Sequence, residues 1–369
     1  MANFDRAVIG SGLFGCYAAI VLAERGHTVA LLDSNPGILS RASYVNQARL
    51  HTGLHYPRSL LTAMEALKSY RRFRTRFPSC IYEFEQIYGV ATRNSKTSGV
   101  DFESFIKRLG IEAELVDPER WFFPGTISRA FRVEEPSFDV ATLRNLLQDE
   151  ISSRAEITYF PKTTVLDGSL VAGELQLLTS GDQRISAEHA VIATYAETNS
   201  VRAKLGLEAL PISYELAEIL LGTVSRNLNG RGFTVMDGPF WSLMPFGKTG
   251  HVSLTSVGHT PLQANPTEPR FSCQDARRDC LPEHLQDCNS CKVRPPSARV
   301  HHVQQMSMFL KCAEEFVPET SLLTVKAILR TTAVDDSRPT LVVHDKSLPV
   351  TTVFSGKVST LLDLEAGLV

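Results

Sequence analysis

The fold is decided by residues 7–15, AVIGSGLFG, in which a short apolar run leads into three spaced glycines. The spacing is G-x-G-x-x-G, the pattern that opens dinucleotide-binding folds. In such a turn Gly10 makes the tight bend, Gly12 lets the backbone approach a pyrophosphate, and Gly15 lets helix and strand pack closely. The N-terminus of the following helix supplies N–H groups and positive partial charge for phosphates. This stretch therefore predicts a strand–turn–helix unit with a phosphate-binding turn.

The segment after the glycines completes the unit. Residues 16–25 predict an apolar helix, and Gly26 fits the left-handed C-cap, which favours a residue without a Cβ. Residues 29–32, VALL, predict a second buried strand that ends at Asp33. An acid about 20 residues after such glycines accepts a ribose hydroxyl. Strand, helix, cap and acid fall in register, so we predict a dinucleotide site rather than an ordinary glycine-rich turn.

Length and composition set the broad class. The chain has 369 residues, enough for about two domains. Its 43% of hydrophobic residues and formal net charge of −2 are typical of a globular protein without a nucleic-acid footprint. No apolar run reaches the roughly 20 residues of a transmembrane helix, and the first strand starts too close to Met1 for a signal peptide. We therefore expect a cytoplasmic protein whose seven cysteines stay reduced.

A polar stretch at residues 40–58, rich in Ser, Asn, Arg and His, has no clean period. Its position directly behind a dinucleotide fold favours a loop that lines a ligand over a plain surface loop. Within it, His51 and His55 are four residues apart but not evidently on a helix, so we do not expect a metal-binding pair. A lone histidine is most often structural, and that alternative stays open for both.

Helices and strands alternate along the rest of the chain. We expect helices at residues 59–77, 102–109 and 297–317, another opened by residues 135–139, a short one at the C-terminal end, and strands at residues 157–160, 163–166, 170–179, 190–194, 218–224, 232–236, 240–244, 252–257, 323–332, 340–344 and 350–354. The alternation between 212 and 257 predicts an antiparallel sheet, which suits a substrate-covering domain. The basic stripe of the helix at 59–77 is interpreted as a solvated face, with a lid for an anionic substrate as the less favoured alternative.

A change of composition at residues 261–296, rich in Pro, Cys, Arg and Asp, predicts an inserted loop. It carries Cys273, Cys280, Cys288 and Cys291, and the last two form a C-x-x-C pair. Four thiolates suit tetrahedral zinc, but the loose spacing of the first pair favours a flexible loop with reduced thiols. A structural zinc ion is the less favoured alternative, and no metal is expected elsewhere. A redox-active pair is disfavoured because Lys-Val-Arg-Pro-Pro follows it where a helix would be expected.

Four stretches carry a family resemblance: residues 10–15 with Asp33; residues 50–56, LHTGLHY; Ala193-Thr194; and Arg338-Pro339 followed by Ser355-Gly356-Lys357. In this order they resemble the D-amino-acid-oxidase-like FAD-dependent oxidoreductases, which include glycine and sarcosine oxidases, glycerol-3-phosphate dehydrogenases and 2-hydroxyglutarate oxidases. The resemblance is close to full length and favours FAD over NAD, although both coenzymes use the opening unit. In that family a glycine often follows the Ala-Thr pair, where this chain has Tyr195.

The resemblance implies an α/β architecture with a discontinuous FAD domain. We expect a Rossmann-type FAD-binding domain from residues 1–60, 135–205 and 330–369, and an α+β substrate domain on a mostly antiparallel sheet from residues 61–134 and 206–329, with the insertion at 261–296. The cofactor-binding residues expected from the fingerprint and the resemblance together are Gly10, Ser11, Gly12, Leu13, Phe14, Gly15, Asp33, Ser34, Arg41, Ser43, Ala48, Arg49, Leu50, Val165, Ala193, Thr194, Ser355, Gly356, Lys357, Val358 and Ser359.

Roles within that set also follow from the resemblance. It places Arg41 and Arg49 along the pyrophosphate and ribityl chain, with Ser43 and Ala48, and gives Val165 a backbone contact on the adenine side. Residues 355–359 would lie beside the isoalloxazine ring, where Lys357 or a helix end would favour the anionic reduced flavin.

Three residues are expected to carry the chemistry. The resemblance favours a catalytic role for His51, because related His-x-Gly stretches place a histidine at the flavin. His55, in the same stretch, is the second candidate. Such a histidine would orient the substrate or remove a proton from an amine or hydroxyl while the adjacent C–H leaves as hydride to flavin N5. Arg338 is the candidate to pair with a substrate carboxylate, and a salt bridge to Asp335 or Asp336 is the alternative.

The expected function is an FAD-dependent oxidoreductase that takes a hydride from the C–N carbon of a small amine or amino acid. A 2-hydroxy acid is the alternative substrate, and a non-catalytic flavin-fold scaffold is the alternative from another class. The expected partner is a small, carboxylated molecule and no nucleic acid; the electron acceptor and any protein partner stay open.

Overall fold

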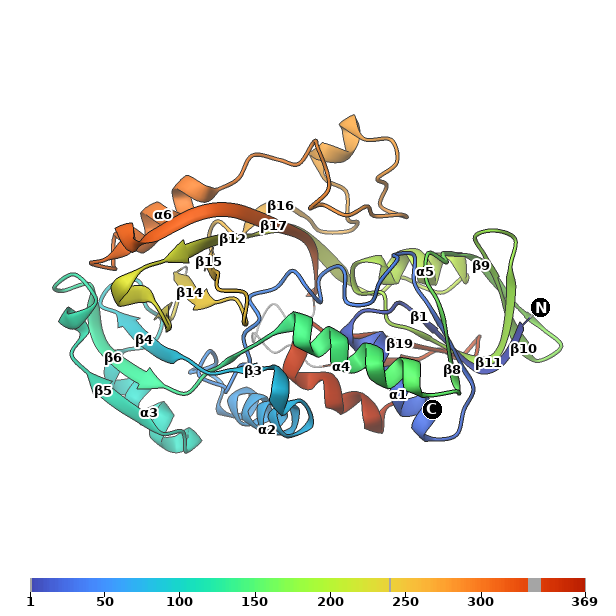
Figure 1. The fold of residues 1–369 in the computed structure, drawn as a ribbon, viewed down its shortest axis with the longest axis horizontal. Helices are drawn as coiled ribbons and strands as arrows, with labels where there is room; N and C mark the ends of the chain where they lie inside the picture. Colours follow the sequence, from blue (N-terminus) through green and yellow to red (C-terminus); the bar gives the residue numbers. More distant parts are fainter. Residues whose placement is uncertain (1, 239, 331–339, 369) are drawn as a thin grey trace.

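Two large sheets organise the computed structural model, which describes residues 2–238, 240–330 and 340–368 (Figure 1). The first sheet has eight strands: β1 (Ala2–Ile9), β2 (Val29–Leu32), β8 (Ile157–Phe160), β9 (Val165–Val171), β10 (Glu174–Thr179), β11 (Arg184–Ile192), β18 (Leu341–His344) and β19 (Val350–Phe354). Its main path runs β18-β19-β11-β1-β2-β8, and all neighbours from β19 to β8 are parallel. Strands from both ends of the chain therefore flank the same centre, as in a Rossmann-type sheet.

The second sheet has nine strands: β4 (Glu85–Ala91), β5 (Ala113–Val116), β6 (Ile127–Val133), β12 (Ile212–Val224), β13 (Arg231–Met236), β14 (Trp241–Pro245), β15 (Val252–Ser256), β16 (Pro261–Asn265) and β17 (Phe316–Leu329). Its pairs are antiparallel apart from β4 with β13. A small third sheet joins β3 (Ile81–Tyr82) to β7 (Ser137–Phe138). The predicted α/β class and mostly antiparallel second sheet are confirmed; the proposed domain boundaries stay a prediction.

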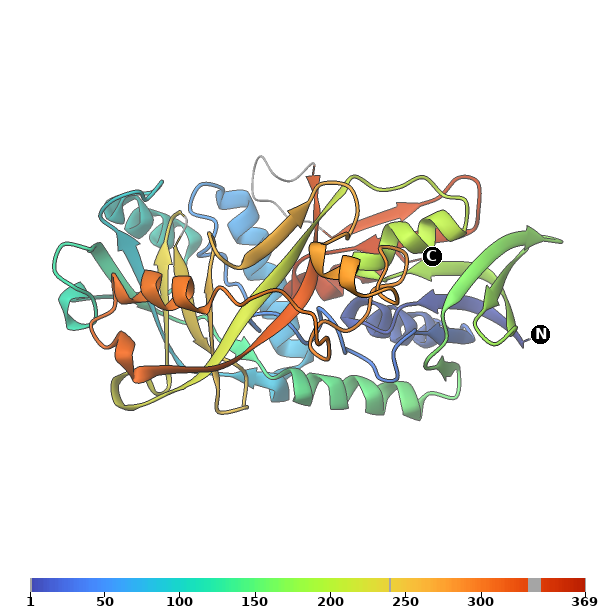
Figure 2. The same ribbon diagram turned by 90° about the horizontal axis from the view of Figure 1, so that it is seen from above.

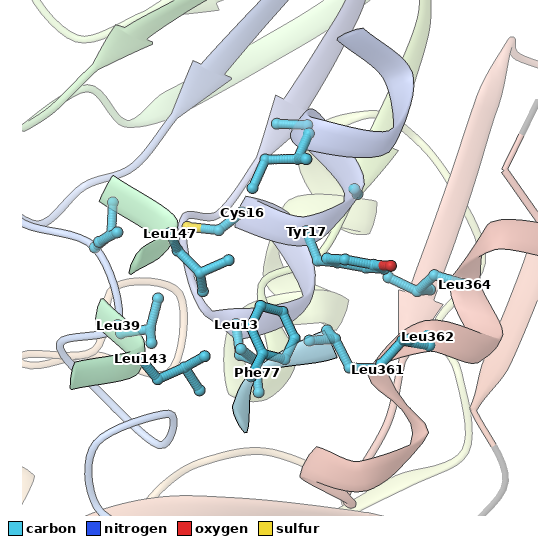
Figure 3. Close-up of a cluster of buried hydrophobic side chains, with 14 of the residues drawn as sticks. Leu13, Cys16, Tyr17, Leu39, Phe77, Leu143, Leu147, Leu361, Leu362 and Leu364 are labelled. Carbon is cyan, nitrogen blue, oxygen red and sulfur yellow. The ribbon is translucent and has the colours of Figure 1, made fainter. Parts of the chain in front are cut away.

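The helices are α1 (Leu13–Glu24), α2 (Leu60–Arg76), α3 (Gly99–Leu109), α4 (Val140–Ser153), α5 (Thr198–Lys204) and α6 (Arg299–Ser307), with 3-10 segments η1 (Pro78–Cys80), η2 (Pro118–Arg120), η3 (Tyr195–Glu197), η4 (Arg226–Leu228), η5 (Ser272–Ala276), η6 (Ala313–Glu315) and η8 (Val358–Ala366). α1 is apolar on all sides because other elements surround it. Figure 3 shows Leu13, Cys16 and Tyr17 between the leucines of α4 and those of η8. This core fixes the start of α1, where the glycine turn lies.

One predicted helix is wrong over half its length. The expected helix at 297–317 ends at Ser307, and Phe316 and Val317 begin β17 instead, paired with Val224 and Thr223. The apolar spacing was misleading, since Val317 is 56% exposed. Pairing along β12 decides the conformation there, because a strand neighbour outweighs local propensity.

The helix predicted at 59–77 is confirmed as α2, capped by the hydroxyl of Ser59, which accepts from the N–H of Thr62. Its buried face includes the small residues Ala63 and Ala66, whereas Met64 is 55% exposed. These small residues allow α2 to lie close to the loop at Gly53. No helix in the described ranges has the length and apolar character needed to cross a bilayer.

Candidate active site

A cavity of about 720 Å³ opens where the carboxyl ends of β1, β2, β11 and β19 meet the second sheet. Ligands of open parallel sheets bind at this edge. The opposite wall comes from β12, β15 and β17 of the second sheet. Figure 2 shows the two sheets side by side, with β12 and β17 running as long neighbours past the first sheet.

The glycine turn at the end of β1 has the geometry that its sequence predicts. Gly10 has φ +103°, and a Cβ there would lie 2.6 Å from the carbonyl oxygen of Ala193. A Cβ on Gly15 would lie 1.8 Å from the carbonyl oxygen of Gly10, so strand and helix touch through backbone alone. α1 starts after Gly12, and the hydroxyl of Ser43 accepts there from the N–H of Leu13 at 2.9 Å. The rest of the amide end of the helix lies at the cavity, which Gly12, Leu13 and Phe14 line.

Asp33 holds this turn from the end of β2. Its Oδ2 accepts from the N–H of Ser11 at 2.6 Å and from the Ser11 hydroxyl at 2.9 Å. Its Oδ1 accepts from the N–H of Asn35 at 2.7 Å. Asp33 also lines the cavity, where the sequence predicts a ribose contact. With the bond from Nδ2 of Asn35 to Oδ1 at 2.8 Å, the carboxylate accepts four hydrogen bonds, so its orientation toward any further donor is fixed.

Most of the expected cofactor-binding residues line this one cavity. They are Gly10, Gly12, Leu13, Phe14, Asp33, Ser34, Arg41, Ser43, Arg49, Val165, Ala193, Thr194, Ser355, Gly356, Lys357 and Val358. The expected candidates that do not line it are Ser11, Gly15, Ala48, Leu50 and Ser359. Arg338, with Asp335 and Asp336, lies outside the described residues.

The differences have local reasons. Ser11 turns its hydroxyl to Asp33, and Gly15 packs on Gly10. Ala48 and Leu50 belong to the apolar core around α1, and Ser359 is buried in η8. Nearness in sequence to a ligand loop does not determine which way each side chain points.

The donor set of the cavity fits FAD. At the end of β11 the buried Oγ1 of Thr194 has no hydrogen-bond partner among the described residues. Just after the neighbouring strand β19, Lys357 is 8% exposed, and its Nζ lies 4.3 Å from the ring centroid of Tyr56. An amide-rich helix end for phosphates, a buried hydroxyl and a buried cation would satisfy the two polar ends of a flavin dinucleotide.

Tyr195 lies where the family resemblance leads us to expect glycine. Its φ is +51°, in the left-handed region that favours glycine. The ring stacks on Phe354 with centroids 5.6 Å apart, which links the ends of β11 and β19. The tyrosine therefore adopts a backbone conformation that glycine adopts readily, and it adds a ring contact.

A tight turn brings the two candidate histidines together. Gly53 has φ +104°, and a Cβ on it would lie 2.5 Å from the carbonyl oxygen of Ala63 in α2. The chain therefore reverses between His51 and His55, and their ring centroids lie 4.7 Å apart. Both line the cavity, so the structure brings the two predicted catalytic residues to one place.

A buried ion pair supports this turn from behind. Residues 48–50 lie antiparallel to residues 136–138, with the N–H of Leu50 donating to the carbonyl of Pro136 at 3.1 Å. This pairing brings Nη1 of Arg49 to 2.7 Å from Oε2 of Glu135, with side chains only 2% and 0% exposed. Arg49 thus has a structural partner, although the resemblance assigns it to the coenzyme.

Tyr88 in β4 connects the ion pair to His55. Its hydroxyl donates to Glu135, accepts from Nη1 of Arg49 at 2.9 Å, and lies 2.7 Å from Nδ1 of His55. Burial raises the pKa of the phenol well above its usual value, so it stays protonated. Its single proton goes to the carboxylate, which can only accept; Nδ1 of His55 must then be the donor. This tautomer leaves Nε2 of His55 as the proton-accepting nitrogen.

His51, His55 and Glu135 also place three possible metal-ligand atoms within 4.8 Å of one another. The carboxylate, however, already accepts from Arg49, from Tyr88 and from the N–H of Thr52 at 3.2 Å. A cation there would have to displace a guanidinium. We therefore interpret the group as a hydrogen-bonded network.

Sequence reasoning missed Glu135 and Tyr88. Glu135 was noted only as part of a helix start, and Tyr88 lies in an apolar strand. One available signal was Arg49 itself, since an arginine expected inside a ligand cavity requires an acidic partner. Local spacing cannot name that partner, because Glu135 is 86 positions away.

Known proteins match this chain over most of its length. The model of a family described as FAD dependent oxidoreductase matches residues 5–335. The chain is 28% identical over 249 residues to the FAD-dependent monooxygenase kojA of Aspergillus flavus, covering 64% of this chain and 57% of that protein. It is 28% identical over 273 residues to the FAD-dependent monooxygenase FPY4 of Fusarium mangiferae, covering 69% and 64%. The chain thus spans about three fifths of these relatives.

Solved structures share the fold at low identity. Glycine oxidase from Geobacillus kaustophilus superposes with a TM-score of 0.72 at 16% identity, over 100% of this chain and 94% of that one. L-alpha-glycerophosphate oxidase from Mycoplasma pneumoniae, solved with FAD bound, gives 0.73 at 12% identity, over the same shares. The amino acid oxidase NikD gives 0.72 at 16%, again over 100% and 94%. The expected family fold and the FAD coenzyme are confirmed.

Proposed function

Because the chain belongs to the FAD-dependent oxidoreductase family, we propose that it oxidises the C–N bond of a small, carboxylated amine or amino acid. FAD, when bound, accepts the hydride at N5. The observation that carries the proposal is the pair His51 and His55 on the cavity wall, oriented through Tyr88 by a buried carboxylate.

The histidine pair supplies the acid–base part of the reaction. An amine must lose its proton before the adjacent carbon can release a hydride, so a neutral imidazole at the cavity is needed. The tautomer of His55 gives it an accepting Nε2, and His51 lies beside it with Nδ1 3.9 Å from Glu135. Removal of the substrate proton is therefore assigned to this pair, with His51 as the residue expected from the sequence.

Charge at the cavity supports a carboxylated substrate. Lys357 is buried at the wall beside Tyr56, and it would favour either a substrate carboxylate or the anionic form of reduced flavin. Arg338 remains the proposed carboxylate partner, because its guanidinium fork matches a carboxylate bidentately.

Two other substrate classes have specific support. The fold shared with a glycerophosphate oxidase favours oxidation of a C–O carbon, such as that of a 2-hydroxy acid. The names of kojA and FPY4 favour monooxygenation. In both cases the same cavity and histidines would act.

An anaerobic substrate screen read by flavin absorbance tests these proposals. We expect amino acids or secondary amines to bleach the flavin without any added reductant. Bleaching only by hydroxy acids would select the C–O alternative, and bleaching only by a reduced nicotinamide would select monooxygenation. Flavin that stays oxidised with every class would favour the scaffold.

Variants then assign the roles. His51→Ala and His55→Ala should each slow reduction by the identified substrate roughly 100-fold while FAD content stays unchanged. His27→Ala, in the turn after α1, is the matched control and should have no effect. An unchanged rate in His51→Ala would remove that residue from the mechanism.

A further inference from the structure

The insertion at residues 261–296 holds its shape with very little core. After β16 it has no regular structure apart from η5, and its buried apolar side chains are Pro269, Phe271 and Leu285. Segments with so few buried residues usually need a cross-link. All seven cysteines are free thiols, so no disulfide supplies one.

Four thiols of the insertion gather at one small pocket. Cys273, Cys280, Cys288 and Cys291 all line it, together with parts of β12 and β17. Each is partly buried, and the chain travels through two turns to bring them there. The remaining half-buried thiol, Cys312, lies outside this group and packs on the second sheet.

Several polar groups around the thiols are donors, and one acid, Asp287, lines the same pocket. The Sγ of Cys280 accepts from the N–H of Gln286 at 3.5 Å and from Nε2 of Gln274 at 3.7 Å. The guanidinium of Arg277 interacts with Cys291. The N–H of Cys291 donates to the carbonyl of Cys288 at 3.4 Å, which closes the C-x-x-C turn. Donors around sulfur are what metal-bound thiolates require in their surroundings.

A redox function fits these thiols less well. Redox-active C-x-x-C pairs usually lie at the N-terminus of a helix, which stabilises the attacking thiolate. Among the described residues no helix begins at Cys288 or Cys291, since the next one, α6, starts at Arg299.

We propose that Cys273, Cys280, Cys288 and Cys291 bind one structural zinc ion that cross-links the insertion. Four sulfur ligands, a closed loop setting and surrounding N–H donors match a structural tetrahedral site. Among the described residues only His51, His55 and Glu135 place three ligand atoms within 4.8 Å. The four sulfurs must therefore draw together as the ion binds, which short loops without regular structure allow.

This ion would stabilise one wall of the FAD cavity. Residues 283–289 of the insertion line that cavity, and Cys288 lines both the cavity and the thiol pocket. Leu285 anchors the wall: its N–H donates to Oε1 of Glu197 at 2.8 Å and its carbonyl accepts from Nη2 of Arg41 at 2.9 Å. The zinc ion thus adds to the proposed function a metal that takes no part in the chemistry.

Metal analysis of the holoenzyme tests the proposal. Protein produced in zinc-supplemented medium and purified without chelators or an affinity tag that binds metal should contain about one zinc ion per chain. A mercurial titration should release that zinc with modification of four thiols. Protein exchanged with Co²⁺ should show the intense visible bands of tetrahedral cobalt thiolate.

Matched variants locate the ion. Cys280→Ser and Cys291→Ser should lose zinc, while Cys312→Ser should keep it and its flavin spectrum. If the serine variants do not fold, the visible spectrum of the unaltered chain exchanged with Co²⁺ shows by itself whether thiolates bind the metal. Zinc-free protein that takes up no zinc or cobalt, or disulfides among these four cysteines in freshly isolated protein, would overturn the proposal, whereas loss of turnover alone bears only on the proposed function.

Discussion

The Nδ1 atom of His55 lies 2.7 Å from the phenolic oxygen of Tyr88, whose proton is committed to the buried carboxylate of Glu135. Three elements meet in this contact: the loop after β2, the strand β4 and the segment before β7. The contact fixes both the position of the imidazole and which of its nitrogens carries the proton.

Replacing the Tyr88 hydroxyl should impair proton removal without loss of coenzyme. In Tyr88→Phe, Nδ1 of His55 loses its acceptor and both tautomers become accessible. We expect anaerobic flavin reduction to slow roughly 10- to 100-fold, with a shifted pH profile and unchanged FAD content. Stopped-flow reduction across pH measures this. Tyr82→Phe, a half-buried tyrosine in β3, is the control, and identical pH profiles for Tyr88→Phe and the unaltered enzyme would contradict the proposed tautomer control.

Breaking the Arg49–Glu135 pair should destabilise the fold. Glu135→Gln leaves a guanidinium buried without its counter-charge, which costs about 3–5 kcal/mol in the free energy of unfolding. The double variant Arg49→Met/Glu135→Gln should recover part of this loss, because no charge is then stranded. Denaturant titration of the unaltered protein, Glu135→Gln, Arg49→Met and the double variant gives the coupling energy between the two side chains. Strictly additive losses would show that the two side chains do not stabilise each other.

The glycine turn offers a matched pair of substitutions. Gly15→Ala places a methyl group against the carbonyl of Gly10, so the turn must move and FAD binding should be lost. Gly37→Ala lies in the loop after Asp33, and no heavy atom lies within 4 Å of its added methyl group. The ratio of flavin to protein absorbance in the purified variants compares them. Equal flavin content in the two variants would show that FAD binding does not depend on the geometry of this turn.

Removal of the proposed zinc ion should weaken FAD binding. The wall at residues 283–289 would lose its cross-link while Leu285 kept its contacts to Glu197 and Arg41. We expect a rise of about tenfold in the dissociation constant of FAD, which corresponds to about 1.4 kcal/mol. Fluorescence of released flavin after chelation measures the rise, and re-addition of zinc should reverse it. An unchanged dissociation constant of FAD in protein proven to be zinc-free would show that this wall does not contribute to FAD binding.

Acid should destabilise the second sheet through His302. This residue is fully buried, with Nδ1 2.9 Å from the hydroxyl of Ser256 and Nε2 3.8 Å from Oε2 of Glu218, and burial lowers its pKa to about 4. His259 and His301 also face it. A folded-state pKa below the unfolded value of about 6.5 means that the unfolded chain binds the proton more readily. Stability is therefore complete above pH 6.5 and falls as the pH drops toward 4.

The size of this effect is at most about 3 kcal/mol, since one pKa unit corresponds to about 1.4 kcal/mol. Denaturant titrations at pH 7 and pH 4.5 measure it. His302→Gln should flatten the pH dependence, whereas His251→Gln, at a half-exposed position beside Glu319, should leave it intact. The same slope in both variants would assign acid sensitivity to other groups.

The parts of the fold that sequence predicted best are those with local causes. The glycine turn and the cap at Ser59 each follow from a backbone conformation or a side chain within a few positions, and Asp33 from the fixed length of one strand–helix–strand unit. The end of α6 was misjudged because β12, far away in sequence, decides the conformation at Phe316. Local patterns carry no information about such a neighbour.

The same limit applies to the site. His51 and His55 were singled out by their own motif, and the structure brings them together on Gly53. Tyr88 and Glu135 could not be found in this way, because their function consists of contacts to residues more than thirty positions away. Arg338 stays a prediction.

The coenzyme site is assembled from opposite ends of the chain, since Gly10 and Ser355 line one cavity and β19 joins the sheet beside β11. During synthesis on the ribosome, the glycine turn emerges long before its last partners do. FAD therefore has no complete site to enter until translation has passed Val358. Before that moment residues 190–192 of β11 lack their partner strand, and an unpaired strand edge of this kind favours aggregation of the nascent chain.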